Sequence, residues 1–66
     1  MLTEQEVINM ALKQMLMLEN LTAQKYTDIA AQITQPDLQN TLKGMEMAVR
    51  NNIKSINQKM SDMSIV

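Results

Sequence analysis

A single proline divides this chain into two long segments, each of which can form one helix. Pro36 is the only proline, and neither proline nor glycine occurs between Thr3 and Ile33. Proline disfavours helical geometry at the residue before it and suits the first turn of a new helix. Gly44 is the only glycine of the second segment. The sequence therefore predicts two long helices joined by one short turn.

Local signals at the helix ends predict the boundaries. Thr3 and Glu6 have the spacing of a capping box, in which each side chain bonds the backbone amide of the other residue, and Leu2 and Val7 are spaced as a hydrophobic staple. We expect one domain over residues 1–66, with a helix over 3–33, a turn at 34–35, a helix over 36–61 and a frayed tail over 62–66. A turn this short requires the two helices to lie antiparallel as a hairpin.

Apolar residues recur along both segments in alternating steps of three and four, which is typical of helical bundles. In the first helix this seam consists of Ile8, Leu12, Met15, Glu19, Thr22, Tyr26, Ile29 and Ile33. In the second helix it consists of Leu38, Leu42, Met45, Val49, Asn52 with Ile53, Ile56, Met60 and Met63. Further apolar residues flank the first seam, namely Ala11, Leu18 and Leu21, and also Leu16, Ala23 and Ala30. Each helix is therefore apolar over more surface than one partner helix can cover.

These wide apolar surfaces predict self-association. A chain of 66 residues buries only a modest fraction of its surface, and without cysteine it has no disulfides to stabilise it. Two hairpins that pack face to face would bury both seams. We therefore expect an all-α fold, an antiparallel two-helix hairpin that forms a homodimeric four-helix bundle.

Composition excludes several classes of function. The chain has no histidine or cysteine, and therefore lacks the usual general base and the commonest transition-metal ligands. Its six basic and seven acidic residues form no basic stripe, and Tyr26 is the only aromatic residue, so we expect no nucleic-acid partner. The longest apolar run is too short to span a bilayer. The first residues, MLTEQEV, lack the basic start and apolar core of a signal peptide. We expect a cytoplasmic protein that is not an enzyme and uses no cofactor.

Glu19 is the one acidic residue in the predicted seam. If the hairpin folds about residues 34 and 35, residue i lies opposite residue 69 − i, and Glu19 faces the region of Val49, Arg50, Asn52 and Ile53. Because burying a lone carboxylate is costly, we expect Glu19 to be buried or half-buried and held by hydrogen bonds, with no metal. Arg50 is the strongest candidate partner, since a charge-assisted bond is stronger than a neutral one. Asn52 is better placed within the seam, and Thr22 and Tyr26 are the other candidates.

A glutamate that points inward at mid-helix, opposite an antiparallel helix, resembles half of a ferritin-like bundle. The stretch QPDLQNTLKGMEMAVRNNIKSINQKM is also similar to the ferritin-like spore coat protein F family. The similarity lies in the acidic residue and leucine after the turn, in the spacing of Leu38, Leu42 and Ile56, and in the closing Met60. The resemblance implies a ferritin-like scaffold that is deposited on the spore coat and contacts other coat or helical proteins. It implies no metal site, because residues such as Val49 and Asn52 occupy the ligand positions.

We weigh three hypotheses for the function. The first is a non-catalytic structural or interaction protein, which the strong packing pattern favours. The second is a carboxylate-only metal site for manganese or magnesium formed by Glu19 and Glu46, although Glu46 is also spaced to pair with Arg50. The third is an adaptor or regulatory module that contacts another protein. Its contact residues would be Leu16, Met17 and Met47, which lie outside the seam.

Overall fold

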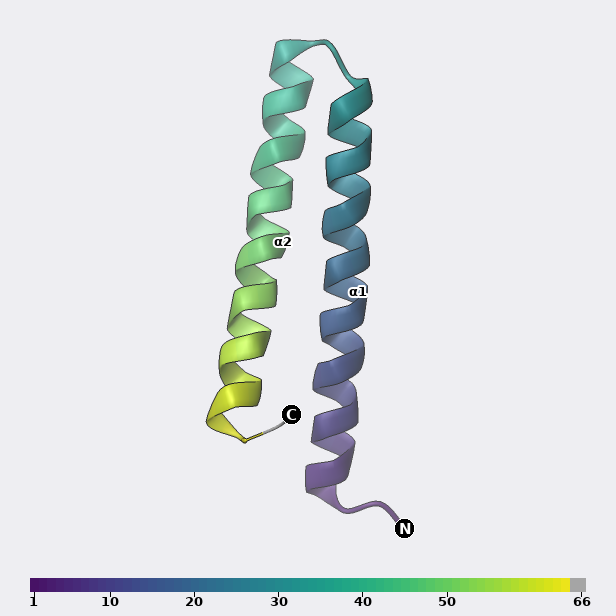
Figure 1. Ribbon diagram of the computed structural model, residues 1–66, viewed down its shortest axis with the longest axis vertical. Helices are drawn as coiled ribbons and strands as arrows, with labels where there is room; N and C mark the ends of the chain where they lie inside the picture. The colour runs from purple at the N-terminus through teal and green to yellow at the C-terminus, as the bar shows by residue number, and fades with distance from the viewer. Residues whose placement is uncertain (65–66) are drawn as a thin grey trace.

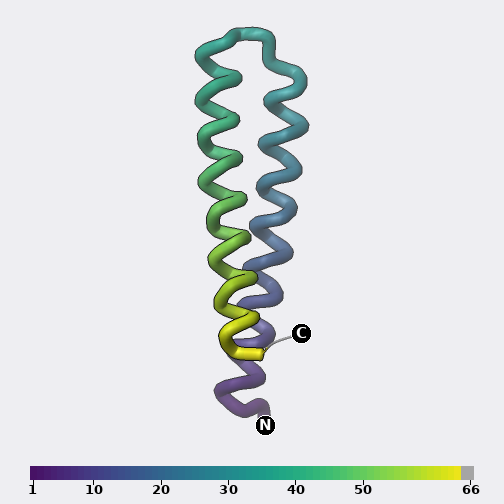
Figure 2. The backbone as a smooth tube through the Cα atoms, turned by 60° about the vertical axis from the view of Figure 1, so that its left-hand side comes forward, coloured from purple at the N-terminus to yellow at the C-terminus, as the bar shows by residue number. Residues whose placement is uncertain are grey.

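The computed structural model describes residues 1–64 and shows an antiparallel helical hairpin (Figure 1). Helix α1 spans Glu4–Gln32 and helix α2 spans Pro36–Asp62. The described residues contain no strand. The two helices lie side by side, with the hinge at one end of the molecule and the N-terminus at the other (Figures 1 and 2). The predicted all-α hairpin is therefore confirmed.

The start of α1 has the capping box that the sequence predicts. The Thr3 hydroxyl oxygen accepts a hydrogen bond from the Glu6 amide at 3.1 Å, and the Glu6 carboxylate accepts one from the Thr3 amide at 3.2 Å. Glu4 and Glu6 also place negative charge in the first turn, where it complements the helix dipole. These contacts satisfy amide groups that would otherwise have no partner in the helix.

The hinge is stabilised by a contact that the sequence analysis did not anticipate. Ile33 and Gln35 are extended, and Pro36 is the first residue of α2. The side-chain amide of Gln39 donates hydrogen bonds to the carbonyl oxygens of Ala30, at 3.3 Å, and Ile33, at 3.2 Å. Carbonyls at the end of a helix lack partners within the helix, so Gln39 of α2 caps the end of α1.

The end of α2 differs slightly from the expectation. The helix continues through Asp62, and the Met63 amide still donates to the Lys59 carbonyl at 3.0 Å. A tail that begins at residue 62 is therefore wrong by one residue. Residues 65–66 of the expected tail lie outside the described residues.

The interface between the helices follows one column of residues on each helix, again in steps of three and four. From α1 it takes Leu12, Leu16, Glu19, Ala23, Tyr26, Ala30 and Ile33. From α2 it takes Gln39, Leu42, Glu46, Val49, Ile53, Ile56, Met60 and Met63. All of these residues are buried or half-buried, and among the hydrophobic residues described only Ala23, Ala30 and Ile56 are more than nine-tenths buried.

Only part of the predicted seam lies in this interface. Leu12, Glu19, Tyr26 and Ile33 of α1 lie there, as do Leu42, Val49, Ile53, Ile56, Met60 and Met63 of α2. Met15, Ile29, Leu38, Met45 and Asn52 are exposed instead, and Ile8 and Thr22 are half-buried. Leu16, Ala23 and Ala30, which the sequence analysis placed on the flank, take the remaining interface positions of α1. Small alanine side chains let two helices approach closely, whereas methionine or isoleucine would hold them apart.

The register between the helices differs from the expected one by about one helical turn. The predicted rule pairs Thr27 with Leu42, but the Thr27 hydroxyl bonds the Glu46 carboxylate, one turn further along α2. The extended residues at the hinge explain the shift, because they place the first turn of α2 beyond the last turn of α1 (Figure 1). The same shift places Glu19 about one turn beyond Arg50 along α2, at the far end of the region of Val49, Arg50, Asn52 and Ile53 that the rule predicts.

The described hairpin is a single layer of two helices. Its principal dimensions are 51 × 20 × 14 Å. Stable domains usually consist of at least two packed layers that bury a shared core. The hairpin therefore has two broad sides, and no second layer of the described chain covers either of them.

Candidate interaction face

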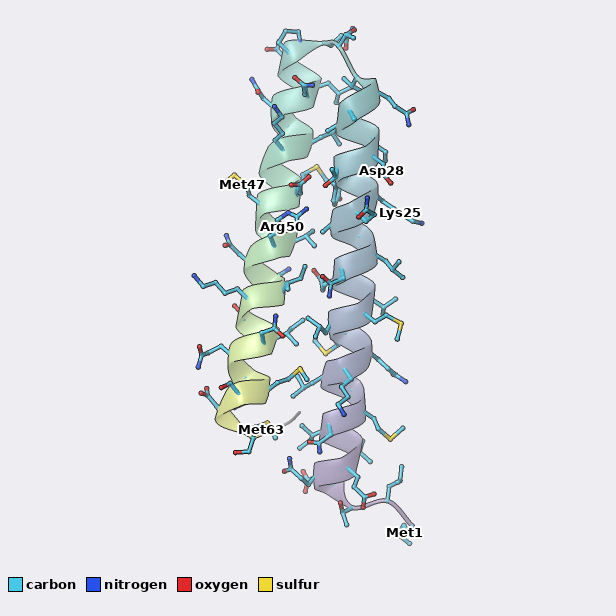
Figure 3. All side chains as sticks on the ribbon, in the orientation of Figure 1. Met1, Lys25, Asp28, Met47, Arg50 and Met63 are labelled. Carbon is cyan, nitrogen blue, oxygen red and sulfur yellow. The ribbon has the colours of Figure 1, made fainter. Side chains whose placement is uncertain are left out.

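A polar network on one broad side shows how the two helices face each other. Thr27 follows the interface residue Tyr26, and Arg50 follows the interface residue Val49. An Arg50 nitrogen donates to the Thr27 hydroxyl at 3.3 Å. The residues that directly follow Tyr26 on α1 and Val49 on α2 therefore lie on the same side of the hairpin. In Figure 3, Arg50 lies at the level of Lys25, and Met47 lies at the level of Asp28.

Glu46 is the centre of this network. Its carboxylate accepts a hydrogen bond from the Thr27 hydroxyl at 2.6 Å and one from the Arg50 guanidinium at 3.0 Å. The Thr27 bond and then the Arg50 bond hold the pKa of Glu46 below its ordinary value, because both favour the charged carboxylate. Glu46 therefore serves as a bridge between the helices on this polar side.

The opposite broad side is apolar. It is formed on each helix by one seven-residue repeat that lies beside the interface, and we call it the apolar face. Its members are Ile8, Met15, Thr22 and Ile29 from α1, and Leu38, Met45, Asn52 and Lys59 from α2. Four large side chains of this face remain 44 to 49% exposed, namely Met15, Ile29, Leu38 and Met45. The apolar face thus contains the part of the predicted seam that the hairpin itself leaves uncovered.

The middle of the apolar face is polar. Asn52 is exposed and Thr22 is half-buried, while Glu19 lies beside them at the edge of the interface. The Thr22 hydroxyl donates to the Leu18 carbonyl at 2.9 Å, as expected for a threonine that bonds back to its own helix. We call Glu19, Thr22 and Asn52 the central polar cluster.

Glu19 lacks the partner that the sequence analysis assigned to it. The residue is half-buried, but its Oε2 atom is shielded from solvent and has no hydrogen-bond partner among residues 1–64. The predicted pairing with Arg50 is wrong, because the shifted register directs Arg50 to Glu46 and Thr27. A buried polar atom without a hydrogen bond destabilises the fold, and such atoms are uncommon in native proteins.

Glu19 and Glu46 do not converge within one hairpin. Glu46 is bonded to Thr27, which lies eight residues after Glu19, or about 12 Å along α1. No group of three acidic, histidine or cysteine residues that could hold a metal ion is found among residues 1–64. Tyr26 is half-buried in the interface between the helices.

The methionines divide into three groups. Met60 and Met63 lie half-buried in the interface, where flexible thioether side chains fill gaps. Met15 and Met45 belong to the apolar face. Met10, Met17 and Met47 are exposed elsewhere, and Met47 points away from α1 (Figure 3).

The residues of the adaptor hypothesis are divided between two environments. Met17 and Met47 are exposed, as that hypothesis requires. Leu16 is half-buried in the column that faces α2, so it offers less surface to an outward contact than Met17 and Met47 do.

The geometry defines the protein as an all-α helical hairpin with one polar and one apolar side. No helix within residues 1–64 has an apolar stretch long enough to cross a membrane. Compared with known proteins, the chain shows no significant match to a family model, to a curated protein or to a solved structure.

Proposed function

We propose that this protein is a non-catalytic structural and interaction protein that works as a pair of hairpins joined through their apolar faces. The observation that carries the proposal is the apolar face itself, which the described chain leaves open over a single layer of helices. Covering this face would supply the second layer that a stable helical domain needs.

A second copy of the chain fits this face in size and charge. A face of 51 × 20 Å can bury roughly 1,600 Å² in total when two copies meet, which is the standard size of a specific interface. The net charge of −1 per chain gives little repulsion between copies. Symmetric dimers use the same patch on both subunits, and the central polar cluster offers that patch both hydrogen-bond donors and an acceptor.

A structural role agrees with the chemistry that the side chains offer. The sequence has no histidine or cysteine. Glu46 is engaged in joining the two helices. The resemblance of the second helix to the spore coat protein F family supports a more specific proposal. In this proposal the paired hairpins form in the cytoplasm, are deposited on the spore coat and contact other coat or helical proteins there.

Sedimentation equilibrium of the purified chain at micromolar concentration tests the pairing. We expect a mass of twice the 7.5 kDa of one chain. Met15→Glu and Met45→Glu each place a charge on the apolar face and should yield monomers. Met17→Glu and Met47→Glu are matched controls outside that face and should leave the mass unchanged. A stably folded monomer of the unchanged chain would contradict the proposal.

A carboxylate-only metal site is the second candidate, and the unpartnered Glu19 oxygen favours it. Two copies of Glu19 brought together could bind manganese through oxygen ligands alone. In that case added manganese should raise the melting temperature by several degrees, and Glu19→Gln should abolish the rise. Under the structural proposal, manganese leaves the melting temperature of both proteins unchanged.

A further inference from the structure

The central polar cluster interrupts the apolar face at its middle. Glu19 lies next to Leu18, the central residue of α1, and Asn52 lies on α2 within about one helical turn of that level, on the side of the hinge. Polar groups at the centre of an apolar interface weaken it unless they are paired, but they can then fix the register and orientation of the helices. The cluster is therefore the part of the face that can decide how two copies meet.

One carboxylate oxygen of Glu19 has no hydrogen-bond donor among residues 1–64. This oxygen is Oε2, and Arg50 is already bonded to Glu46 and Thr27. In a single hairpin the half-buried side chain can still turn towards water. A second copy on the apolar face would remove that water, so the carboxylate would then require a donor from the other copy.

Asn52 is the amide donor at the middle of the apolar face, whereas Lys59 lies two turns nearer the open end. It is exposed on that face, and its side-chain amide can donate hydrogen bonds to a carboxylate. We propose, on the basis of the self-association proposed above, that two copies pack with their hinges at the same end of the bundle. In this arrangement α1 lies against α2 of the second copy, and the Glu19 carboxylate accepts a hydrogen bond from Asn52 of the second copy.

The alternative orientation brings like charges together. If the hinges lay at opposite ends, α1 would lie against α1 of the second copy in antiparallel direction. Because Glu19 is near the centre of α1, the two Glu19 carboxylates would then meet in the interface. Two carboxylates that share a site disfavour each other's ionised form. Hinges at the same end instead pair one acceptor with one donor, and the two-fold symmetry makes this contact twice.

Distances between spin labels distinguish the two orientations. The chain has no cysteine, so Thr34→Cys at the hinge and Ser61→Cys at the open end each introduce a single labelling site. With the hinges at the same end, two labels at residue 34 should be about two to three helix spacings of about 10 Å apart. With the hinges at opposite ends, the same labels should be separated by nearly the 51 Å length of the hairpin. In heterodimers formed by mixing the two variants, the label at residue 34 should lie far from the label at residue 61 if the hinges are at the same end. The two labels should lie close together if the hinges are at opposite ends.

A charge swap tests the proposed Glu19–Asn52 contact directly. Asn52→Asp places a carboxylate against Glu19 of the other copy and should raise the dissociation constant of the dimer about tenfold or more. The double variant Glu19→Gln with Asn52→Asp exchanges the amide and the carboxylate, and should restore the original dissociation constant. Asn51→Asp makes the same chemical change one residue earlier, outside the apolar face, and is the matched control that should leave the dissociation constant unchanged.

The outcomes distinguish a failure of the proposed orientation from a failure of the proposed self-association. Short distances between the hinges together with rescue by the charge swap support both. A dimer with long distances between the hinges, or a swap that does not rescue association, overturns the inference and leaves the dimer standing. An unchanged protein that stays monomeric overturns the proposed function itself.

Discussion

Thr27 shows how a single hydroxyl group can join two helices. Its oxygen lies 2.6 Å from a Glu46 oxygen and 3.0 Å from the Ala23 carbonyl, so its one hydrogen can serve either acceptor. The same oxygen accepts from Arg50 at 3.3 Å. Because both Thr27 and Arg50 bond the charged form of Glu46, this carboxylate stabilises the hairpin only while it is ionised.

The pH dependence of stability should reveal this contribution. The pKa of Glu46 in the folded hairpin lies below its value in the unfolded chain, so its stabilising effect is present above the unfolded pKa. It is lost as the pH falls through the folded pKa. We therefore expect Glu46→Gln to lower the free energy of unfolding at pH 7, and to make little difference in strong acid.

Urea unfolding of both proteins from pH 7 to pH 2 provides the measurement. Asp28→Asn is the matched control, because Asp28 is an exposed carboxylate near the end of α1 whose asparagine can still accept from Gln24. A stability difference for Glu46→Gln that persists unchanged at the lowest pH would contradict the assigned role.

Gln39 makes a second residue-level prediction. Gln39→Ala removes the two hydrogen bonds to the Ala30 and Ile33 carbonyls, and should cost about 1 kcal/mol of unfolding free energy. Asn40→Ala, one residue further on an exposed part of α2, corrects for the general effect of introducing alanine. Thermal or urea unfolding of the two variants checks the prediction. Equal stability of the two variants would show that the capping bonds contribute nothing measurable.

At the scale of the helices, the parts that the sequence predicted are those with local signals. The Thr3 capping box and Pro36 mark where the helices begin, and the observed helix ends fall within one residue of the predicted ones. Spacing alone could not decide which apolar column faces the neighbouring helix. The column that contains Met15 and Ile29 has the same period as the column that contains Ala23 and Ala30. Side-chain size shows which column faces α2 only when the distance between the two helices is known.

The contacts at the hinge were harder to predict for a different reason. In the sequence Gln39 resembles any exposed helical glutamine, and its position one turn into α2 was the only signal that its side chain can reach the end of α1. The register depended on the extended hinge residues, and an error of one turn there moved Arg50 away from Glu19. The capping of α1 and the partner of Arg50 are therefore consequences of the hinge geometry.

Pro36 carries the prediction for the hinge as an element. Pro36→Ala should keep the hairpin but destabilise it by roughly 1 kcal/mol, because the unfolded chain gains conformational freedom. Small-angle scattering should then show a longest dimension that matches that of the unchanged protein. If alanine lets α1 and α2 fuse into one helix, the longest dimension would approach about 90 Å. Thr34→Ala, an exposed hinge residue without the proline ring, is the control.

The whole molecule has very little interior of its own. Only Ala23, Ala30 and Ile56 are more than nine-tenths buried among the hydrophobic residues described, and the hairpin is 14 Å thick. Under the proposed pairing of hairpins, most of the stability comes from association, so the melting temperature should depend on protein concentration.

Circular dichroism melts over a hundredfold range of concentration provide this test. We expect the melting temperature of the unchanged protein to fall steadily on dilution. Met45→Glu on the apolar face should lower the melting temperature and remove its dependence on concentration, whereas Met47→Glu should behave as the unchanged protein does. A melting temperature that is independent of concentration in the unchanged protein would mean that the single hairpin is stable alone.

The hinge also determines the order in which the hairpin can open. Contacts beside it, such as Gln39 with Ile33, close a loop of a few residues, whereas those at the level of Leu12 and Met60 close a loop of most of the chain. Each doubling of loop length adds about 0.6 kcal/mol to the entropy cost of closure. Local opening should therefore begin at the free ends of the helices and proceed towards the hinge. Hydrogen exchange should be slowest for amides near Ala30 and Leu42, and uniform protection along both helices would show instead that the hairpin opens in one step.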